Sequence, residues 1–287
     1  MGAHTAMSSV RRKVAVITGA GSGIGRALAL ELARREASIA VSDVDPIGLR
    51  ETADQVAALG ARVHQQLLDV SDAAAFETYA HTVAEHFGVV HQIYNNAGIG
   101  AGRAFLDSEL RDYELVLGIN LWGVIHGTKA FLPHLIASGD GHVINVSSLN
   151  GYMAQPDHGP YVTSKFAIRG FTETLRIEMA FANHPVTVTC VHPGGVKTNI
   201  AVNAIAAAES EGLEPTAADR ARAEVINDKV LKLDPTKAAR IIVDGVEAKS
   251  PRILVGTDAK ITDLLVRLMP RQYTKVVVAL NRRLLTP

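Results

Sequence analysis

The chain of 287 residues predicts an α/β fold: a single doubly wound domain on a mostly parallel, seven-stranded sheet. Two observations carry this prediction. Short apolar runs alternate with helical segments from Lys13 onward, and parallel strands need crossover helices between them. The runs are apolar along their whole length, which is typical of strands covered by helices on both faces. The alternation continues to about Gly256 without a linker or a repeat that would divide the chain.

The first part of the chain contains four strand-like runs separated by three helices. The helix starts are marked by Asp or Ser and by Pro at a first helical position, and the helix ends are marked by Gly after the last turn. We expect strands at Val14–Thr18, Ile39–Ser42, Arg62–Leu67 and Gln92–Asn95. We expect helices at Gly23–Glu36, from the Asp45-Pro46 cap to Gly60, and from the Ser71 cap to Gly88.

The second part repeats the pattern with longer helices. We expect helices at about Asp107–Ala137, at about Tyr161–Ala182, and from Asp234-Pro235 to near Lys249. Strands are expected at Gly141–Val146, Thr187–His192 and Ile253–Val255. The predicted organisation is therefore a flexible tail over 1–12, a nucleotide-binding and catalytic domain over 13–256 with a substrate lid at about 199–233, and a helical extension over 257–287.

Composition excludes several classes of function. Lys plus Arg and Asp plus Glu each number 29, so no net charge attracts nucleic acid. Hydrophobic residues make up 47% and charged residues 20%, which excludes a disordered chain. No apolar leader or membrane-length apolar run is evident, which predicts a cytoplasmic protein without a transmembrane segment. The eleven histidines include no HExxH motif, and no metal site is predicted.

A glycine-rich turn follows the first strand. Gly19, Ser22, Gly23, Ile24 and Gly25 join that strand to the first helix, where backbone N–H groups and the helix N-terminus suit a pyrophosphate. A turn of this kind in a first β-α unit predicts a Rossmann-type dinucleotide site. An ordinary strand-to-helix turn is the alternative.

A carboxylate at the end of the second strand indicates which dinucleotide binds. Asp43 stands 24 residues after Gly19, where it can accept hydrogen bonds from both ribose hydroxyls of NAD and repel the 2′-phosphate of NADP. No basic residue follows in Val44-Asp45-Pro46, and Ser22 adds none in the glycine-rich turn. NAD is therefore favoured over NADP.

A tyrosine and a lysine share one face of a later helix. Tyr161 and Lys165 are four positions apart, so the phenol and the ammonium lie together. A free phenol has a pKa of about 10, and a neighbouring cation lowers it toward the range of a useful base. Ser148 stands 13 residues earlier, just beyond a strand end where ligands gather in such sheets. Alone, the Tyr/Lys pair is common on solvated helices.

Further motifs stand at strand ends and helix starts along the chain. In order, the motifs are Thr18–Gly25, Asn95-Asn96-Ala97-Gly98, Asn120, Ser148, Tyr161-x-x-x-Lys165 and Pro193–Thr198. In order and spacing, they together resemble the short-chain dehydrogenase/reductase family, in its shorter branch. The resemblance covers about Lys13 to Gly256. One departure is His91-Gln92-Ile93-Tyr94, where the family more often has Asp and aliphatic residues.

The resemblance implies a role for each motif residue. Tyr161 would be the general acid/base, Lys165 would lower its pKa and hold the nicotinamide ribose, and Ser148 would bind the substrate oxygen. Asn120 would anchor a water in the proton relay. The implied cofactor contacts are Asp69 and Val70 at the adenine, Asn95 and Gly98 beside the cofactor, and Val196 and Thr198 at the carboxamide.

The expected activity is NAD-dependent interconversion of a secondary alcohol and a ketone. An NADPH-preferring carbonyl reductase and a non-catalytic dinucleotide-sensing scaffold are the alternatives. A medium-sized, largely apolar substrate is expected, and the sequence leaves its identity and stereochemistry and the reaction direction open. The pocket is expected to be lined by Gly100–Leu106, Leu149–Pro160, Gly195 and the lid, where Ile200, Val202 and Ile205 either line it or pack on the core.

The segment from Leu264 to Pro287 carries basic residues and no acidic ones. Its apolar residues Tyr273, Val276, Val277, Leu280 and Leu284 recur at helical spacing. Packing on the body or on a partner subunit is one interpretation, and a weak peripheral membrane contact is the other. The family resemblance implies a homodimer or homotetramer. The basic residues are Arg267, Arg271, Lys275, Arg282 and Arg283.

Overall fold

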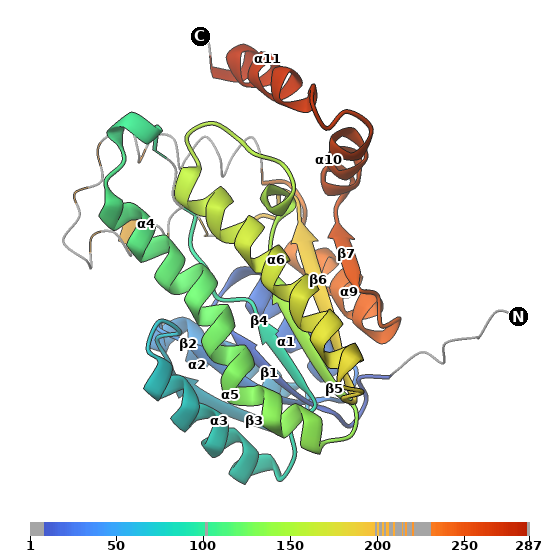
Figure 1. Cartoon of the computed structure of the whole chain (residues 1–287). Coiled ribbons are helices and arrows are strands. Elements are labelled where there is room, and N and C mark those ends of the chain that lie inside the picture. Colours follow the sequence, from blue (N-terminus) through green and yellow to red (C-terminus); the bar gives the residue numbers. More distant parts are fainter. Residues whose placement is uncertain are drawn as a thin grey trace, which may run out of the picture.

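A computed structural model describes residues 9–100, 103–198 and 231–285, with isolated positions at 200, 203, 205, 206, 209, 214, 216 and 220. Its centre is one seven-stranded sheet in the order β3-β2-β1-β4-β5-β6-β7. Every neighbouring pair of strands is parallel, so the sheet is entirely rather than mostly parallel. The predicted doubly wound α/β fold is confirmed (Figure 1).

The strands follow the apolar runs of the sequence. β1, β4 and β5 are buried along their whole length because helices cover both faces of the sheet. β3 lies at an edge and carries the polar run His64-Gln65-Gln66, of which Gln65 is exposed. The strands are β1 Val14–Thr18, β2 Ser38–Asp43, β3 Val63–Leu67, β4 Gln92–Asn95, β5 Gly141–Val146, β6 Val186–Pro193 and β7 Arg252–Val255.

Two layers of helices enclose the sheet and bury a separate apolar core on each face (Figure 1). One layer contains α1 Gly23–Arg34, α2 Pro46–Ala58 and α9 Pro235–Glu247. The other contains α3 Ala73–Phe87, α4 Leu110–Leu117, α5 Gly123–Ala137 and α6 Gly159–Phe181. Beyond β7, α10 Thr257–Leu268 and α11 Tyr273–Leu285 extend from the body (Figure 1).

The strand order reverses beside β1. The chain runs outward from β1 to β2 and β3, and then returns to β4 on the other side of β1. A crevice therefore opens beyond the carboxyl ends of β1 and β4, the usual ligand position in an open α/β sheet. The glycine-rich turn follows β1 and the Asn95–Gly98 motif follows β4, so both motifs lie at this crevice.

One predicted helix start is wrong by a residue. Asp72, rather than Ser71, caps α3, and its carboxylate accepts the N–H groups of Ala74 and Ala75 at 2.9 and 3.0 Å. The Ser71 hydroxyl instead donates to Asp69. Adjacent Ser and Asp are both good caps, and the sequence alone does not separate them. At the starts of α2 and α9 the expected caps, Asp45 and Asp234, are present.

The long helix expected from Asp107 is interrupted. A short 3-10 turn, Phe105–Asp107, precedes α4, and a π-helical turn, Gly118–Trp122, joins α4 to α5. By length and composition, Leu110–Ala137 could cross a membrane, with a mean hydropathy of 1.3 in its most apolar window. In this fold it packs beside α3 and α6 and buries Phe131 and Leu135 in the core.

Candidate active site

The four predicted catalytic residues meet at the carboxyl end of β5. Ser148 follows that strand, and Tyr161 and Lys165 lie in the first turns of α6, which begins two residues earlier than expected. The Ser148 hydroxyl lies close enough to the Tyr161 phenol to lower its pKa. The Lys165 ammonium lies 5.5 Å from the centroid of the Tyr161 ring.

Gly98 lets Asn120 and Lys165 approach the end of β4. A Cβ at Gly98 would lie 3.0 Å from Asn120 Oδ1 and 3.5 Å from Lys165 Nζ. A side chain here would press on the Asn120 amide and would touch the Lys165 ammonium. Gly98 therefore shapes the site by the absence of a side chain.

Lys165 is buried, with an exposed fraction of 3%. Its ammonium donates to the Val146 carbonyl at 3.2 Å, and its own backbone carbonyl accepts the Ser147 hydroxyl at 2.8 Å. Burial lowers the pKa of Lys165 to about 8, because the surrounding protein disfavours the charged amine. Lys165 thus remains mostly protonated at neutral pH, and burial of its charge lowers the stability of the fold.

The Tyr161 pKa differs from the simple expectation. Part of the ring is open to solvent, yet burial of the phenol raises its pKa above the ordinary value. The Ser148 hydroxyl offsets only part of this rise. The net shift is therefore upward in the protein alone, and the predicted lowering by Lys165 does not outweigh burial.

Asn120 lies in the π-helical turn and is fully buried. Its amide oxygen accepts the Ile99 N–H at 2.8 Å, and its amide nitrogen donates to the Ile99 carbonyl and to Ser164 Oγ. The Ser164 hydroxyl in turn donates to the Tyr161 carbonyl at 2.7 Å. The Asn120 side chain thus ties the segment after β4 to the helix that carries Tyr161.

Polar side chains from three segments hold the glycine-rich turn in place. Asn96 donates to the carbonyls of Thr18 and Gly19, and Thr18 Oγ1 accepts the N–H groups of Asn96 and Ala97. Thr52 donates to the Ala20 carbonyl at 2.8 Å. Thr18 and Asn96 lie inside the quoted motifs, whereas no sequence pattern indicated Thr52.

The geometry of the turn requires glycine. Gly19 and Gly23 have φ angles of +64° and +53°, which side chains rarely adopt. A Cβ at Gly25 would collide with the Gly19 carbonyl. Ser22 is the extended N-cap of α1, and Ile24 packs on the core below it. The resulting cradle leaves the N-terminus of α1 open to an anionic group.

Asp43 contacts the same turn. Its Oδ2 accepts the Gly21 N–H at 2.7 Å, and its Oδ1 accepts the Asp45 N–H at 3.0 Å. The carboxylate is therefore held in one orientation at the end of β2, beside the glycine-rich turn.

The remaining predicted cofactor residues after β3 and β4 fall into two groups. Asp69 is exposed and bonded to Ser71, and Val70 is buried with its carbonyl 3.1 Å from His126 Nδ1. Asn95 is buried below the crevice, where its amide donates to Asn145 and Thr128. The Asn95 side chain therefore joins β4 to β5 and α5, and only its backbone lies toward the crevice.

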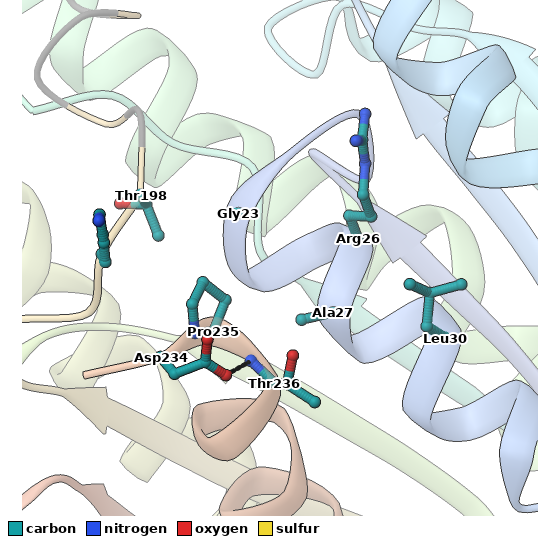
Figure 2. Close-up of a pocket in the computed structure, with 9 residues that line it drawn as sticks. Gly23, Arg26, Ala27, Leu30, Thr198, Asp234, Pro235 and Thr236 are labelled. Atoms are coloured by element: carbon teal, nitrogen blue, oxygen red, sulfur yellow. Dashed lines mark hydrogen bonds between the residues drawn. The ribbon is translucent and has the colours of Figure 1, made fainter. Parts of the chain in front are cut away.

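Thr198 faces the glycine-rich turn from the segment after β6. A Cβ at Gly23 would lie 3.0 Å from Thr198 Cγ2. Val196 is buried and forms an isolated bridge with Leu233. Thr198, Gly23 and Arg26 line an open hollow of about 330 Å³, which the start of α9 also borders. Figure 2 shows these residues around it. Ser148, Tyr161 and Lys165 do not line this hollow.

The lid lies largely outside the described residues, and this includes Val202. Ile200 and Ile205 are described and are half-buried. Among the described residues, no cluster of three or more His, Cys, Asp or Glu side chains could hold a metal ion.

Comparisons with known proteins identify the family of the chain. Residues 13–209 match the family described as short chain dehydrogenase. SadH of Mycobacterium tuberculosis, which is named an oxidoreductase, is 50% identical over 273 residues, and the match covers 95% of this chain and 96% of that protein. Human estradiol 17-beta-dehydrogenase 11 is 29% identical over 270 residues, covering 94% and 83%.

A solved structure is similar over nearly the whole chain. The short-chain dehydrogenase/reductase from Burkholderia phymatum, in complex with NAD, is 34% identical with a TM-score of 0.85, and the match covers 92% of this chain and 96% of that one. The chain therefore belongs to the short-chain dehydrogenase/reductase family and is an oxidoreductase that acts on CH–OH groups.

Proposed function

We propose that this protein interconverts a secondary alcohol and a ketone with NAD as the hydride carrier. The observation that carries the proposal is the meeting of Ser148, Tyr161 and Lys165 at the crevice that the glycine-rich turn also borders. In reduction, the Tyr161 hydroxyl gives its proton to the substrate oxygen, and in oxidation the phenolate takes it back. Ser148 orients that oxygen, and protonated Lys165 stabilises the phenolate.

The residues around the crevice fit a dinucleotide. Side chains at Gly19 or Gly25 would fill the cradle, and the N-terminus of α1 suits the pyrophosphate. The cofactor would accept the hydride as NAD⁺ in oxidation and supply it as NADH in reduction. In this proposal, Asp69 and Val70 flank the adenine, Lys165 contacts the nicotinamide ribose, and Val196 and Thr198 face the carboxamide.

Asp43 supports NAD rather than NADP. Its carboxylate is held at the end of β2, where it would accept the ribose hydroxyls and oppose a 2′-phosphate. An NADPH-preferring reductase would need a cation there, and Val44-Asp45-Pro46 supplies none.

Apolar side chains that follow Ser148 form the proposed wall of the substrate site. Leu149, Tyr152 and Met153 follow that residue and form an apolar cluster with Val277 of α11. One relative is named estradiol 17-beta-dehydrogenase 11, after a largely apolar alcohol. We propose a medium-sized apolar alcohol or ketone on this basis.

We also propose a cytoplasmic homodimer or homotetramer. The outer face of α6 exposes Phe166, Ile177 and Phe181, with exposed fractions of 40, 70 and 89%. Such a row of apolar side chains on a long helix suits a two-fold contact with a second copy.

The test of the function is a spectrophotometric assay at 340 nm with alcohols and ketones and with each cofactor. Tyr161→Phe should reduce kcat by at least about 100-fold, because it removes only the proton-transfer oxygen. The dissociation constant of NAD should change less than about twofold. Tyr113→Phe, in α4, is the matched control. Retention of half the turnover in Tyr161→Phe would exclude the mechanism, and NAD binding without turnover on any substrate would favour a sensor.

A further inference from the structure

The start of the C-terminal extension touches the segment after β6. Asp258, in the first turn of α10, accepts the Gly195 N–H on Oδ2 at 2.6 Å. Its Oδ1 accepts the N–H of Ala259 at 2.9 Å. The carboxylate thus joins the extension to the backbone that continues into Val196 and Thr198.

The glycines around Asp258 leave room for its carboxylate. A Cβ at Gly194 would collide with both carboxylate oxygens, so the bend after Pro193 closes directly over Asp258. Gly256 has a φ of +100°, and a Cβ there would lie 2.5 Å from Oδ1. Two glycines from separate strand ends therefore enclose one carboxylate.

The neighbouring residue reaches the second active-site loop. The Ala259 carbonyl accepts the Tyr152 hydroxyl at 2.6 Å. The Tyr152 ring packs 5.2 Å from His192, and His192 Nδ1 lies 2.8 Å from the Ser148 carbonyl. Burial lowers the pKa of His192 to about 4, so the ring is neutral and donates through Nδ1. Asp258 and Ala259 together therefore contact the loops after β5 and β6.

We propose that Asp258 is a positioning residue for the nicotinamide end of the cofactor site. It fixes Gly195 and, through the chain, the Val196–Thr198 segment that would contact the carboxamide. The inference rests on the proposed function, because that function places the carboxamide at this segment. It assigns to the extension a role in cofactor geometry, in addition to its packing beside Ser148.

The test compares two ligands by titration calorimetry. NAD reaches the nicotinamide end of the site, whereas ADP-ribose stops short of it. Asp258→Ala should raise the dissociation constant of NAD about tenfold, the effect of losing a hydrogen bond to a charged group. The dissociation constant of ADP-ribose should change less than about twofold. Asp258→Asn, which retains one acceptor oxygen, should fall between Asp258→Ala and wild type.

Asp263 provides the matched control. It lies in the same helix and bonds to Arg252 at 2.6 Å, but the structure shows no contact between it and Gly195 among the described residues. Asp263→Ala should lower the melting temperature while leaving the ratio of the two dissociation constants unchanged. If Asp263→Ala weakens NAD as selectively as Asp258→Ala does, general loosening of α10 explains the effect and the inference is wrong.

A double-mutant cycle isolates the contact. Gly194→Ala alone should weaken NAD strongly, because its Cβ meets the carboxylate. In the Asp258→Ala background the same change should cost much less, since the colliding atoms are gone. Additive effects, or equal weakening of NAD and ADP-ribose, would overturn the positioning role. Failure of the wild-type protein to bind either ligand would contradict the proposed function itself.

Discussion

Lys165 combines a buried amine with a functional demand for positive charge. Its pKa is about 8 in the folded protein and 10.5 when unperturbed. Below pH 8 the amine is therefore charged in the folded and the unfolded chain, and its desolvation lowers the free energy of unfolding. That desolvation cost is ~3 kcal/mol at 1.36 kcal/mol per pKa unit. Between these two values the unfolded chain binds more protons, and the contribution of Lys165 to stability rises with pH.

Removal of the amine should therefore stabilise the protein at neutral pH. We expect Lys165→Met to raise the free energy of unfolding at pH 7 by ~1–2 kcal/mol, the desolvation cost less one lost hydrogen bond to Val146. The advantage should vanish near pH 10.5, where the unfolded chain also loses the proton. Urea titrations at both pH values measure it, with exposed Lys129→Met as the control. A less stable variant at pH 7 would contradict this account.

Asp43 should determine the choice of cofactor. We expect wild-type kcat/KM for NAD to exceed that for NADP at least about tenfold, because like charges at the 2′-phosphate cost ~1–3 kcal/mol. Asp43→Ala should narrow this difference in kcat/KM and weaken the binding of NAD, since the change also removes the acceptor of the Gly21 N–H.

Asp43→Asn separates the two effects of that residue. Its amide oxygen still accepts the Gly21 N–H, while the negative charge is gone. NADP use should therefore improve with less loss of NAD binding than in Asp43→Ala. Equal use of both cofactors by the wild-type enzyme would show that Asp43 does not discriminate.

At the scale of elements, sequence patterns located the strands well. Most strands are short apolar runs, because helices cover both faces of the sheet. The edge strand β3 is the polar exception, with His64-Gln65-Gln66 at its centre. The catalytic set was predicted because its residues occur in motifs of fixed spacing. The Asp258 contact with Gly195 joins positions far apart in the chain, and no local pattern indicates it.

The sequence patterns do not predict two features of the helices. Apolar periodicity continues through Asn120, so the π-helical turn leaves little trace in the sequence. In the extension, α10 ends before Pro270. The apolar residues of α11 have two environments, because Val277 and Tyr273 pack beside Tyr152 while Leu280 remains exposed. Packing on the body thus accounts for some of these residues, and it depends on tertiary contacts rather than on spacing.

The whole molecule offers a test of the extension. Truncation after Met269 removes α11 and uncovers Tyr152 and Met153, which follow Ser148. We expect substrate KM to rise about threefold to tenfold, consistent with the loss of one buried apolar contact. NAD affinity should change little, because the glycine-rich turn and Asp43 are held by contacts within β1–β4 and α1–α2. Unchanged KM would contradict the proposed wall.

The same variant distinguishes a subunit contact from a membrane contact. The segment that it removes, α11, exposes Val278 and Leu280 beside the basic Lys275 and Arg282. Sedimentation of both proteins, with and without anionic vesicles and at two salt concentrations, measures assembly and lipid binding together. A smaller assembly after truncation supports a subunit contact. Salt-sensitive vesicle binding that is lost with α11 supports the membrane alternative.

The strand order also bears on how the chain assembles during synthesis. After β4, each new strand pairs with the strand made just before it, so the sheet can extend at one edge as the polypeptide lengthens. The contact between α1 and α9 is different, because Arg35 meets Asp244 and Glu247 more than 200 residues later. The ribosome must release nearly the whole domain before these side chains can meet. The nucleotide cradle at the start of α1 is thus among the first parts made, whereas the contact between α1 and α9 forms only after residue 247 has been made.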